Sequence, residues 1–251
     1  MILIPVTRSV LYLDGLSVSF DGFKALNNLS IDLAPGELRA VIGPNGAGKS
    51  TMMDVVTGKT RPDEGTALFL GSHDLTVLDE TEIANLGIGR KFQKPSVIET
   101  LTVEENLELA LAGNRSPWQA IMQILRPQDH RSMNEVASRV GLTDALDQLG
   151  GALSHGQKQW LEIGMLLLQE PKVLLVDEPA AGMTDSETLK TAELLKSLAG
   201  EHTVMVVEHD MEFVEALGCK VTVLHEGRVL AEGSLPHVSS NNEVIDVYLG
   251  R

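Results

Sequence analysis

A glycine-rich segment that ends in a lysine and a serine shows the clearest capacity for chemistry. Residues 43–50 read GPNGAGKS and match the spacing G-x-x-x-x-G-K-[ST]. Glycines let successive backbone N–H groups converge on phosphate oxygens, a lysine adds a flexible cation, and a serine hydroxyl can ligate Mg²⁺. A chance glycine-rich turn is the alternative, but an apolar strand pattern before the segment and a helix pattern after it favour the phosphate site. The residues expected to bind a triphosphate are Gly43, Asn45, Gly46, Ala47, Gly48, Lys49, Ser50 and Thr51.

Two adjacent carboxylates follow an apolar run at residues 173–176. In a phosphate-loop protein the first of them, Asp177, belongs with Ser50 to the Mg²⁺ shell, and the second, Glu178, is placed to polarise an attacking water. A plain acidic turn explains this motif better when it is taken alone. Together with the phosphate loop the pair predicts hydrolysis, because ligands of open α/β sheets lie at the carboxyl ends of the strands.

Apolar runs alternate with amphipathic segments along most of the chain. This alternation indicates a parallel sheet covered by helices on both faces. From residue 100 to residue 151 the apolar residues recur at helical spacing, which predicts an inserted helical subdomain within a single domain made otherwise of residues 1–99 and 152–251. Strands are expected over residues 11–13, 16–20, 29–33, 38–42, 66–70, 173–176, 204–207, 221–224 and 229–231, and helices over 49–57, 154–170 and 187–198.

The composition excludes several classes of function. The chain has 251 residues, 43% of them hydrophobic, with a formal net charge of -15 and a pI near 4.8. No basic run that could neutralise nucleic-acid phosphates is present, so no nucleic-acid partner is expected. Cys219 is the single cysteine, which rules out an internal disulfide. The apolar runs are far shorter than the about 20 residues that span a bilayer, so a role at a membrane requires a partner protein.

Three further segments complete an ordered set of motifs. Gln93 follows the run at residues 87–92, residues 153–157 read LSHGQ, and His209 follows the apolar run at residues 204–207. With the phosphate loop and the carboxylate pair, this order resembles the nucleotide-binding subunit of ATP-binding-cassette (ABC) transporters over essentially the whole chain. The resemblance implies an α/β phosphate-loop NTPase cassette with a RecA-like core, an N-terminal antiparallel β subdomain and a helical insert. It also implies ATP hydrolysis with Mg²⁺ by a head-to-tail dimer that encloses two ATP molecules.

The segment LSHGQ is the most specific part of the resemblance. By that resemblance Ser154, Gly156 and Gln157 contact the γ-phosphate that the opposite subunit holds. Taken alone, the spacing of Ser154 and Gln157 is that of a capping box and indicates only the start of a helix.

The resemblance assigns roles to further single residues. Gln93 senses Mg²⁺ and water while touching the membrane partner, and His209 orients the γ-phosphate and the attacking water. Phe20 matches the aromatic side chain that stacks on adenine, and Phe23 is a weaker alternative. A phenylalanine in an N-terminal strand is as often part of the core, so both interpretations stay open.

Two positions depart from the family pattern. His155 stands where the family has the first signature glycine, which alters the backbone approach to phosphate. In the loop after the carboxylate pair, called the D-loop, Thr184 occupies the position of the aspartate and Asp185 follows it. This departure puts the usual contact across the dimer in question, although it leaves hydrolysis intact.

Residues 180–185 (AAGMTD) narrow the resemblance to the group of importers of branched-chain amino acids and urea. Within that group, three segments are similar to one ATPase subunit of urea importers: residues 89–95 (GRKFQKP), 152–160 (ALSHGQKQW) and 247–251 (VYLGR). The implied assembly is a homodimer, or a heterodimer with a second ATPase chain, bound to two membrane permeases at the cytoplasmic face of the inner membrane and supplied by a periplasmic or extracellular substrate-binding protein. The alternatives are an importer of branched-chain amino acids, an ABC protein without a transporter, and a nucleotide-sensing scaffold without catalysis.

Overall fold

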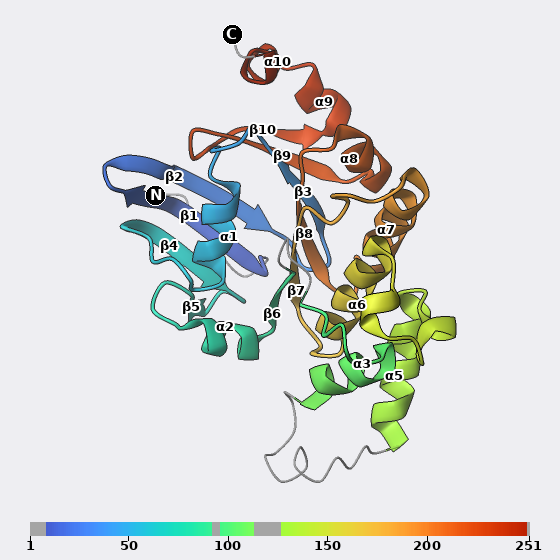
Figure 1. Ribbon diagram of the computed structural model, residues 1–251. Coiled ribbons are helices and arrows are strands. Elements are labelled where there is room, and N and C mark those ends of the chain that lie inside the picture. The colour runs from blue at the N-terminus through green and yellow to red at the C-terminus, as the bar shows by residue number, and fades with distance from the viewer. Residues whose placement is uncertain (1–8, 92–95, 113–126, 250–251) are drawn as a thin grey trace.

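The computed structural model describes residues 9–91, 96–112 and 127–249, and a six-stranded sheet forms its centre (Figure 1). The strand order is β10-β9-β3-β8-β7-β6, with every neighbouring pair parallel except β9 and β10. This is the α/β arrangement that the alternation of strands and helices predicts. The strands are β3 (Leu38–Ile42), β6 (Ile88–Lys91), β7 (Val173–Asp177), β8 (Thr203–Val207), β9 (Lys220–His225) and β10 (Arg228–Ser234).

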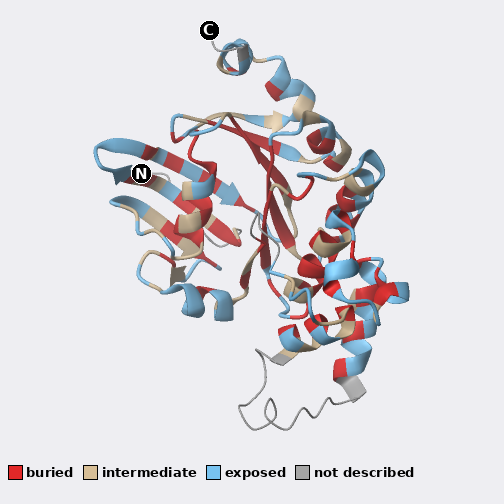
Figure 2. Cartoon of the chain, viewed as in Figure 1, coloured by how far each residue is buried: buried red, intermediate tan, exposed pale blue. Residues whose placement is uncertain are grey.

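The side chains of the central strands enter two different hydrophobic cores. Because successive residues of a strand point to opposite faces, each continuous apolar run supplies both cores. Figure 2 shows the resulting line of buried residues along the middle of the sheet. One core contains Ala40, Ile42, Leu174, Val176, Val204 and Val206. The other contains Val41, Val173, Leu175, Met205 and Val207.

Helices and a second sheet cover the two faces (Figure 1). On one side lie α1 (Lys49–Val56) and the antiparallel sheet of order β2-β1-β4-β5. On the other side lie α6 (His155–Leu167), α7 (Asp185–Leu198) and α8 (Met211–Leu217), with α3 (Val103–Ala112) and α5 (Pro127–Arg139) packed beyond them. The remaining α-helices in the described part of the chain are α2 (Glu80–Leu86), α9 (Leu235–Ser239) and α10 (Asn242–Leu249). No helix within the described residue ranges is both long and apolar enough to cross a membrane.

The antiparallel sheet corrects one prediction of the sequence analysis. Residues 11–13 and 16–20 were expected as two short strands, but they form one strand, β1 (Leu11–Phe20), that continues past Gly15. Gly15 has a φ of 63° and interrupts the pairing with β2 (Phe23–Leu33) without ending the strand. The sheet is completed by β4 (Glu64–Phe69) and β5 (His73–Asp74).

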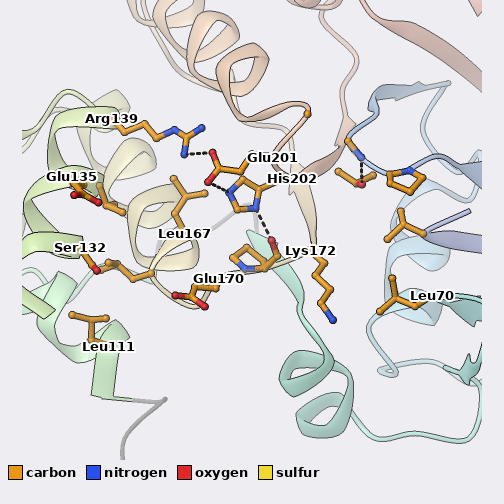
Figure 3. A pocket seen from close by; sticks show the side chains of 18 residues that line it. Leu70, Leu111, Ser132, Glu135, Arg139, Leu167, Glu170, Lys172, Glu201 and His202 are labelled. Atoms are coloured by element: carbon orange, nitrogen blue, oxygen red, sulfur yellow. Dashed lines mark hydrogen bonds and ion pairs between the residues drawn. The ribbon is translucent and has the colours of Figure 1, made fainter. Parts of the chain in front are cut away.

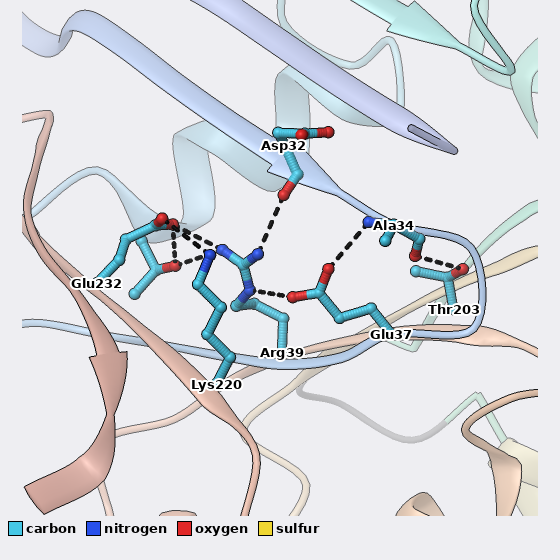
Figure 4. Close-up of polar contacts among 8 residues, drawn as sticks. Asp32, Ala34, Glu37, Arg39, Thr203, Lys220 and Glu232 are labelled. Carbon is cyan, nitrogen blue, oxygen red and sulfur yellow. Dashed lines mark hydrogen bonds and ion pairs between the residues drawn. The ribbon is translucent and has the colours of Figure 1, made fainter. Parts of the chain in front are cut away.

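A buried arginine joins the two sheets (Figure 4). The guanidinium of Arg39, on β3, contacts Glu37 Oε1 and Glu232 Oε1, each at 2.6 Å. It also donates to the Thr222 hydroxyl at 2.9 Å and to the backbone carbonyl of Asp32, at the end of β2, at 3.0 Å. Arg39 is 1% exposed, so its positive charge is stabilised entirely by these partners.

We expect Arg39→Ala to lower the free energy of unfolding by about 3–5 kcal/mol, because it leaves two carboxylates without their buried cation. Urea denaturation measures this difference. Lys220→Ala is the matched control, since Lys220 contacts the same Glu232 at 3.1 Å from the surface and an exposed pair contributes about 0–1 kcal/mol. Equal effects of the two substitutions would contradict the assigned role of Arg39.

Candidate active site

The phosphate loop connects β3 to α1, and the side chain of Lys49, the first residue of α1, folds back onto the loop. Lys49 Nζ donates to the backbone carbonyls of Gly43 at 2.6 Å and Pro44 at 3.0 Å. Burial lowers the pKa of the Lys49 ammonium, and the negative charges of Glu178 and Asp177 oppose that change. The ammonium therefore lies against the backbone of the loop, where the charges of Asp177, at the end of β7, and of Glu178, directly after it, act on it.

Two glycines of this loop are required by close backbone contacts. Gly43 has a φ of 154°, and a Cβ atom there would lie 2.3 Å from the carbonyl oxygen of Leu224. Gly48 has a φ of 102°, and its Cβ would lie 2.6 Å from the carbonyl oxygen of Ala25. Glycine leaves the backbone N–H groups of the loop uncovered, which suits phosphate binding. The close contacts with Leu224 and Ala25 also require glycine at these two positions.

Asp177 ends β7, where it meets an arginine that the sequence analysis did not assign to the site. Arg90 Nη2, from β6, lies 3.3 Å from Asp177 Oδ2, and Arg90 Nη1 pairs with Asp54 on α1. Burial raises the pKa of the Asp177 carboxyl, while the hydrogen bond and charge of Arg90 lower it. Arg90 thus connects the phosphate-loop helix to the expected Mg²⁺ ligand. Residues 89–95 supported only the family resemblance, and nothing in their spacing indicated this contact.

The structure brings Glu178 and His209 together. His209 Nδ1 lies 3.4 Å from Glu178 Oε1, at the carboxyl ends of neighbouring strands β7 and β8. Glu178 has a φ of 46°, and its backbone N–H donates to the carbonyl of Val207 at 2.9 Å. The Glu178 side chain is 27% exposed and that of His209 62%, so both are accessible to water and nucleotide.

Glu208 is a second residue near this pair that sequence reasoning missed. It is 1% exposed and accepts hydrogen bonds from the backbone N–H groups of Ala180 at 3.1 Å and His209 at 2.9 Å. Burial raises the pKa of its carboxyl, and those backbone donors oppose the shift. Glu208 therefore joins the segment after Glu178 to the segment that carries His209.

Residues 154–157 begin α6 on the opposite side of the central sheet from α1 (Figure 1). The predicted capping box is confirmed, because Ser154 Oγ accepts from the Gln157 N–H at 3.1 Å while the Gln157 side chain accepts from the Ser154 N–H at 2.9 Å. His155 Nε2 contacts the backbone carbonyl of Ala181 at 3.0 Å. Thr184 caps α7 through Glu187 in the same reciprocal manner.

Three further residues were predicted for the site: Phe20, Phe23 and Gln93. Phe20 and Phe23 are cross-strand partners at the end of the β1–β2 hairpin, and they are 50% and 63% exposed. Neither belongs to the core, so both are available for stacking. Gln93 lies outside the described residues.

The cavity in Figure 3 lies at the amino ends of the strands, away from the phosphate loop. It measures about 650 Å³ and is lined by Lys172 and Thr203, at the amino ends of β7 and β8. Its polar groups pair with one another, as Arg139 with Glu201 at 2.7 Å and His202 Nδ1 with the Pro171 carbonyl at 2.6 Å. The phosphate loop, Asp177 and His209 lie at the opposite, carboxyl ends of the strands, so this cavity is not part of the candidate active site.

The residues present fit a nucleotide with Mg²⁺. The loop between Gly43 and Lys49 offers an uncovered backbone and an ammonium, while Ser50 on α1 offers a hydroxyl and Asp177 at the end of β7 offers a carboxylate. Among the described residues, no group of three or more histidine, cysteine or acidic side chains could hold a metal ion by itself. A Mg²⁺ ion that takes few protein ligands and several phosphate oxygens suits this donor set.

Comparisons with known proteins agree with this geometry. A family model described as ABC transporter matches residues 26–181. The high-affinity branched-chain amino acid transport ATP-binding protein LivG of Escherichia coli is 33% identical over 98% of this chain and 99% of its own length. A putative ribose/galactose/methyl galactoside import ATP-binding protein of Burkholderia ambifaria is 34% identical over 98% of this chain and 47% of its own length.

Solved structures give the same result. An ATP-binding cassette of an ABC transporter in its ADP conformation has a TM-score of 0.84 at 30% identity, covering 98% of this chain and all of that one. A dimeric bacterial ABC transporter cassette has a TM-score of 0.76 at 26% identity, covering 90% and 98%. Fold and site together define a phosphate-loop ATPase. The chain belongs to the ABC transporter family, as one of its ATP-binding and ATP-hydrolysing cassettes.

Proposed function

We propose that this chain is the ATPase subunit of an ABC importer, in which ATP hydrolysis is coupled to uptake of a small polar solute. The observation that carries the proposal is the 3.4 Å approach of His209 to Glu178, which directly follows the strand that ends in Asp177. The charge of Glu178 also acts on Lys49 of the phosphate site and raises its pKa. Transport is supported by the relative in Escherichia coli, which is named for amino acid transport, and import by the relative in Burkholderia ambifaria, which is named for sugar import.

Each residue has one task in the proposed reaction. Lys49 and the loop N–H groups bind the β- and γ-phosphates, and Glu178 polarises the water for in-line attack on the γ-phosphorus. His209 orients that water and the γ-phosphate from its position beside Glu178. When bound by Ser50 and Asp177, Mg²⁺ supplies charge neutralisation at the phosphate oxygens. Gln93 is proposed to respond to the state of that site.

Two cassettes are needed to complete each nucleotide site in this proposal. Ser154 begins a helix on the far side of the sheet from α1, so it serves the nucleotide of the opposing cassette (Figure 1). The similarity to a dimeric cassette supports this pairing. The partner is a second copy or a second ATPase chain, since both give the same facing arrangement.

The dimer is proposed to act at the cytoplasmic face of the inner membrane. There it binds two permease subunits, which receive solute from a periplasmic or extracellular binding protein. The helices within residues 100–151 are proposed as the subdomain that contacts the permeases. ATP closes the dimer, and closure moves the permeases only to the extent that ATP binds the closed state more tightly.

Two solutes are candidates. Branched-chain amino acids are supported by relatives such as LivG of Escherichia coli and the probable LivG of Archaeoglobus fulgidus, which is 34% identical over 96% of this chain. Urea is supported by three short segments that resemble a urea importer subunit, residues 89–95, 152–160 and 247–251. The relatives cover the whole chain and the segments only part of it, so branched-chain amino acids are the first solute to test.

The decisive experiment is reconstitution of the chain with its permeases and binding protein in lipid vesicles. We expect leucine to raise the rate of ATP hydrolysis, with urea as the comparison solute and Lys49→Met as the inactive control. Stimulation by urea alone would move the assignment to the urea importer. Failure of the chain to associate with any permease would overturn the importer function.

A further inference from the structure

The hydroxyl of Ser154 already has an acceptor within its own chain. Ser154 Oγ donates to Glu187 Oε1 at 2.8 Å, and it accepts the N–H of Gln157 at 3.1 Å. Glu187 lies on α7, 33 residues further along the chain. The side chain expected to reach a γ-phosphate thus donates to a carboxylate of its own chain.

The Glu187 carboxylate is held firmly in place and ionised. Its Oε2 accepts from the backbone N–H and the hydroxyl of Thr184, both at 3.0 Å. The Thr184 N–H, followed by the hydroxyls of Ser154 and Thr184, lowers the pKa of this carboxyl. Thr184 stands at the position where the family pattern has an aspartate, so this departure from the pattern supports the cap that positions Glu187.

The same carboxylate lies against the first turn of α6. A Cβ atom at Gly156 would be 2.6 Å from Glu187 Oε1, so any larger residue there would displace this carboxylate. The N-terminus of a helix carries a partial positive charge that attracts anions. Glu187 therefore satisfies both the serine hydroxyl and this partial charge. The hydrogen bond between His155 and the Ala181 carbonyl is a further link between the two segments.

We propose that Glu187 is a positioning residue that competes with the γ-phosphate of the opposing cassette for Ser154 and for the start of α6, and thereby sets how tightly ATP closes the dimer. This inference rests on the proposed function of Ser154. In the open state the hydroxyl donates to Glu187, and in the closed state it turns to the phosphate. The negative charge of Glu187 disfavours the closed state, because it lies beside the approaching phosphate oxygens.

Glu187→Gln tests the competition with little change in structure. Glutamine is as suitable as glutamate at this position of a capping box, so Thr184 keeps its partner while the charge is lost. A charge at a helix terminus changes an affinity by about 2- to 5-fold, so we expect the ATP-dependent dimer, with its two sites, to tighten by about 4- to 25-fold. Sedimentation velocity with ATP and Mg²⁺, in the Glu178→Gln background that prevents hydrolysis, measures the dissociation constant.

Glu193→Gln is the matched control, because it removes one exposed carboxylate from the same helix without contacting Ser154. A tighter dimer for Glu187→Gln alone supports the inference, since a purely structural role could only weaken the dimer. An unchanged or weaker dimer overturns it. A Glu178→Gln protein that forms no dimer with ATP, alone or with a second ATPase chain, instead overturns the proposed two-cassette site. If only the mixed pair forms, the same comparison is made on that pair.

Discussion

Glu178→Gln is expected to lower the rate of ATP hydrolysis by about 10²- to 10⁴-fold while ATP binding is preserved. The substitution keeps the size of the side chain and removes the negative charge that polarises the attacking water. The backbone contact of Glu178 with Val207 persists, and the amide oxygen can still reach His209, so the loop geometry is retained. Steady-state hydrolysis and equilibrium binding of ATP, measured on the same protein, separate the two effects.

Glu212→Gln is the control for this experiment. Glu212 is an exposed carboxylate in the first turn of α8, only three positions beyond His209 in the sequence. The Glu212→Gln protein should hydrolyse ATP at the rate of the unmodified protein. Near-normal hydrolysis by Glu178→Gln would remove Glu178 from the proposed role and direct attention to Glu208 and His209.

Lys49→Met is expected to weaken ATP binding by about 10- to 150-fold, the loss that corresponds to one hydrogen bond to a charged group. Methionine fills a similar volume without a charge. Because burial disfavours the Lys49 ammonium in the folded chain, its removal should leave the stability of the fold largely unchanged. Calorimetric titration with ATP measures the affinity, and thermal unfolding checks the fold.

Lys59→Met provides the comparison for the lysine experiment. Lys59 follows α1, its side chain is 54% exposed, and its nearest acidic contact is Asp54 at 3.8 Å. This substitution should leave ATP affinity unchanged. Equal ATP affinity of the Lys49→Met and unmodified proteins would contradict the phosphate-loop assignment, and with it the ATPase mechanism.

The polar contacts around the site follow from the order of the strands. β7 lies between β6 and β8, so Arg90 and His209 approach the end of β7 from its two sides. These contacts could not be predicted from the spacing of residues along the chain, because their partners are far apart in sequence. Arg90, for example, is 87 positions away from Asp177. A family resemblance assigns His209, whereas no pattern in the sequence assigns Arg90. Glu208 was missed for the same reason, since its partner Ala180 is 28 positions away.

The sequence alone determined the features that depend on consecutive residues. These include the phosphate loop between a strand and a helix, the carboxylate pair at the end of an apolar strand, and the cap formed by Ser154 and Gln157. Periodicity and capping are local, so neighbouring residues suffice to predict them. Continuous apolar runs likewise predicted a sheet that is buried on both faces.

Only the tertiary structure decided which distant side chains meet. The pairing of Ser154 with Glu187, the exposure of Phe20 and Phe23, and the approach of Arg90 to Asp177 all depend on how helices and strands are placed around one sheet. Strand order and helix packing are set by the burial of whole faces, which is a property of the complete chain. The order of residues along the sequence gives the identity of each side chain but not the distances between side chains in the folded chain.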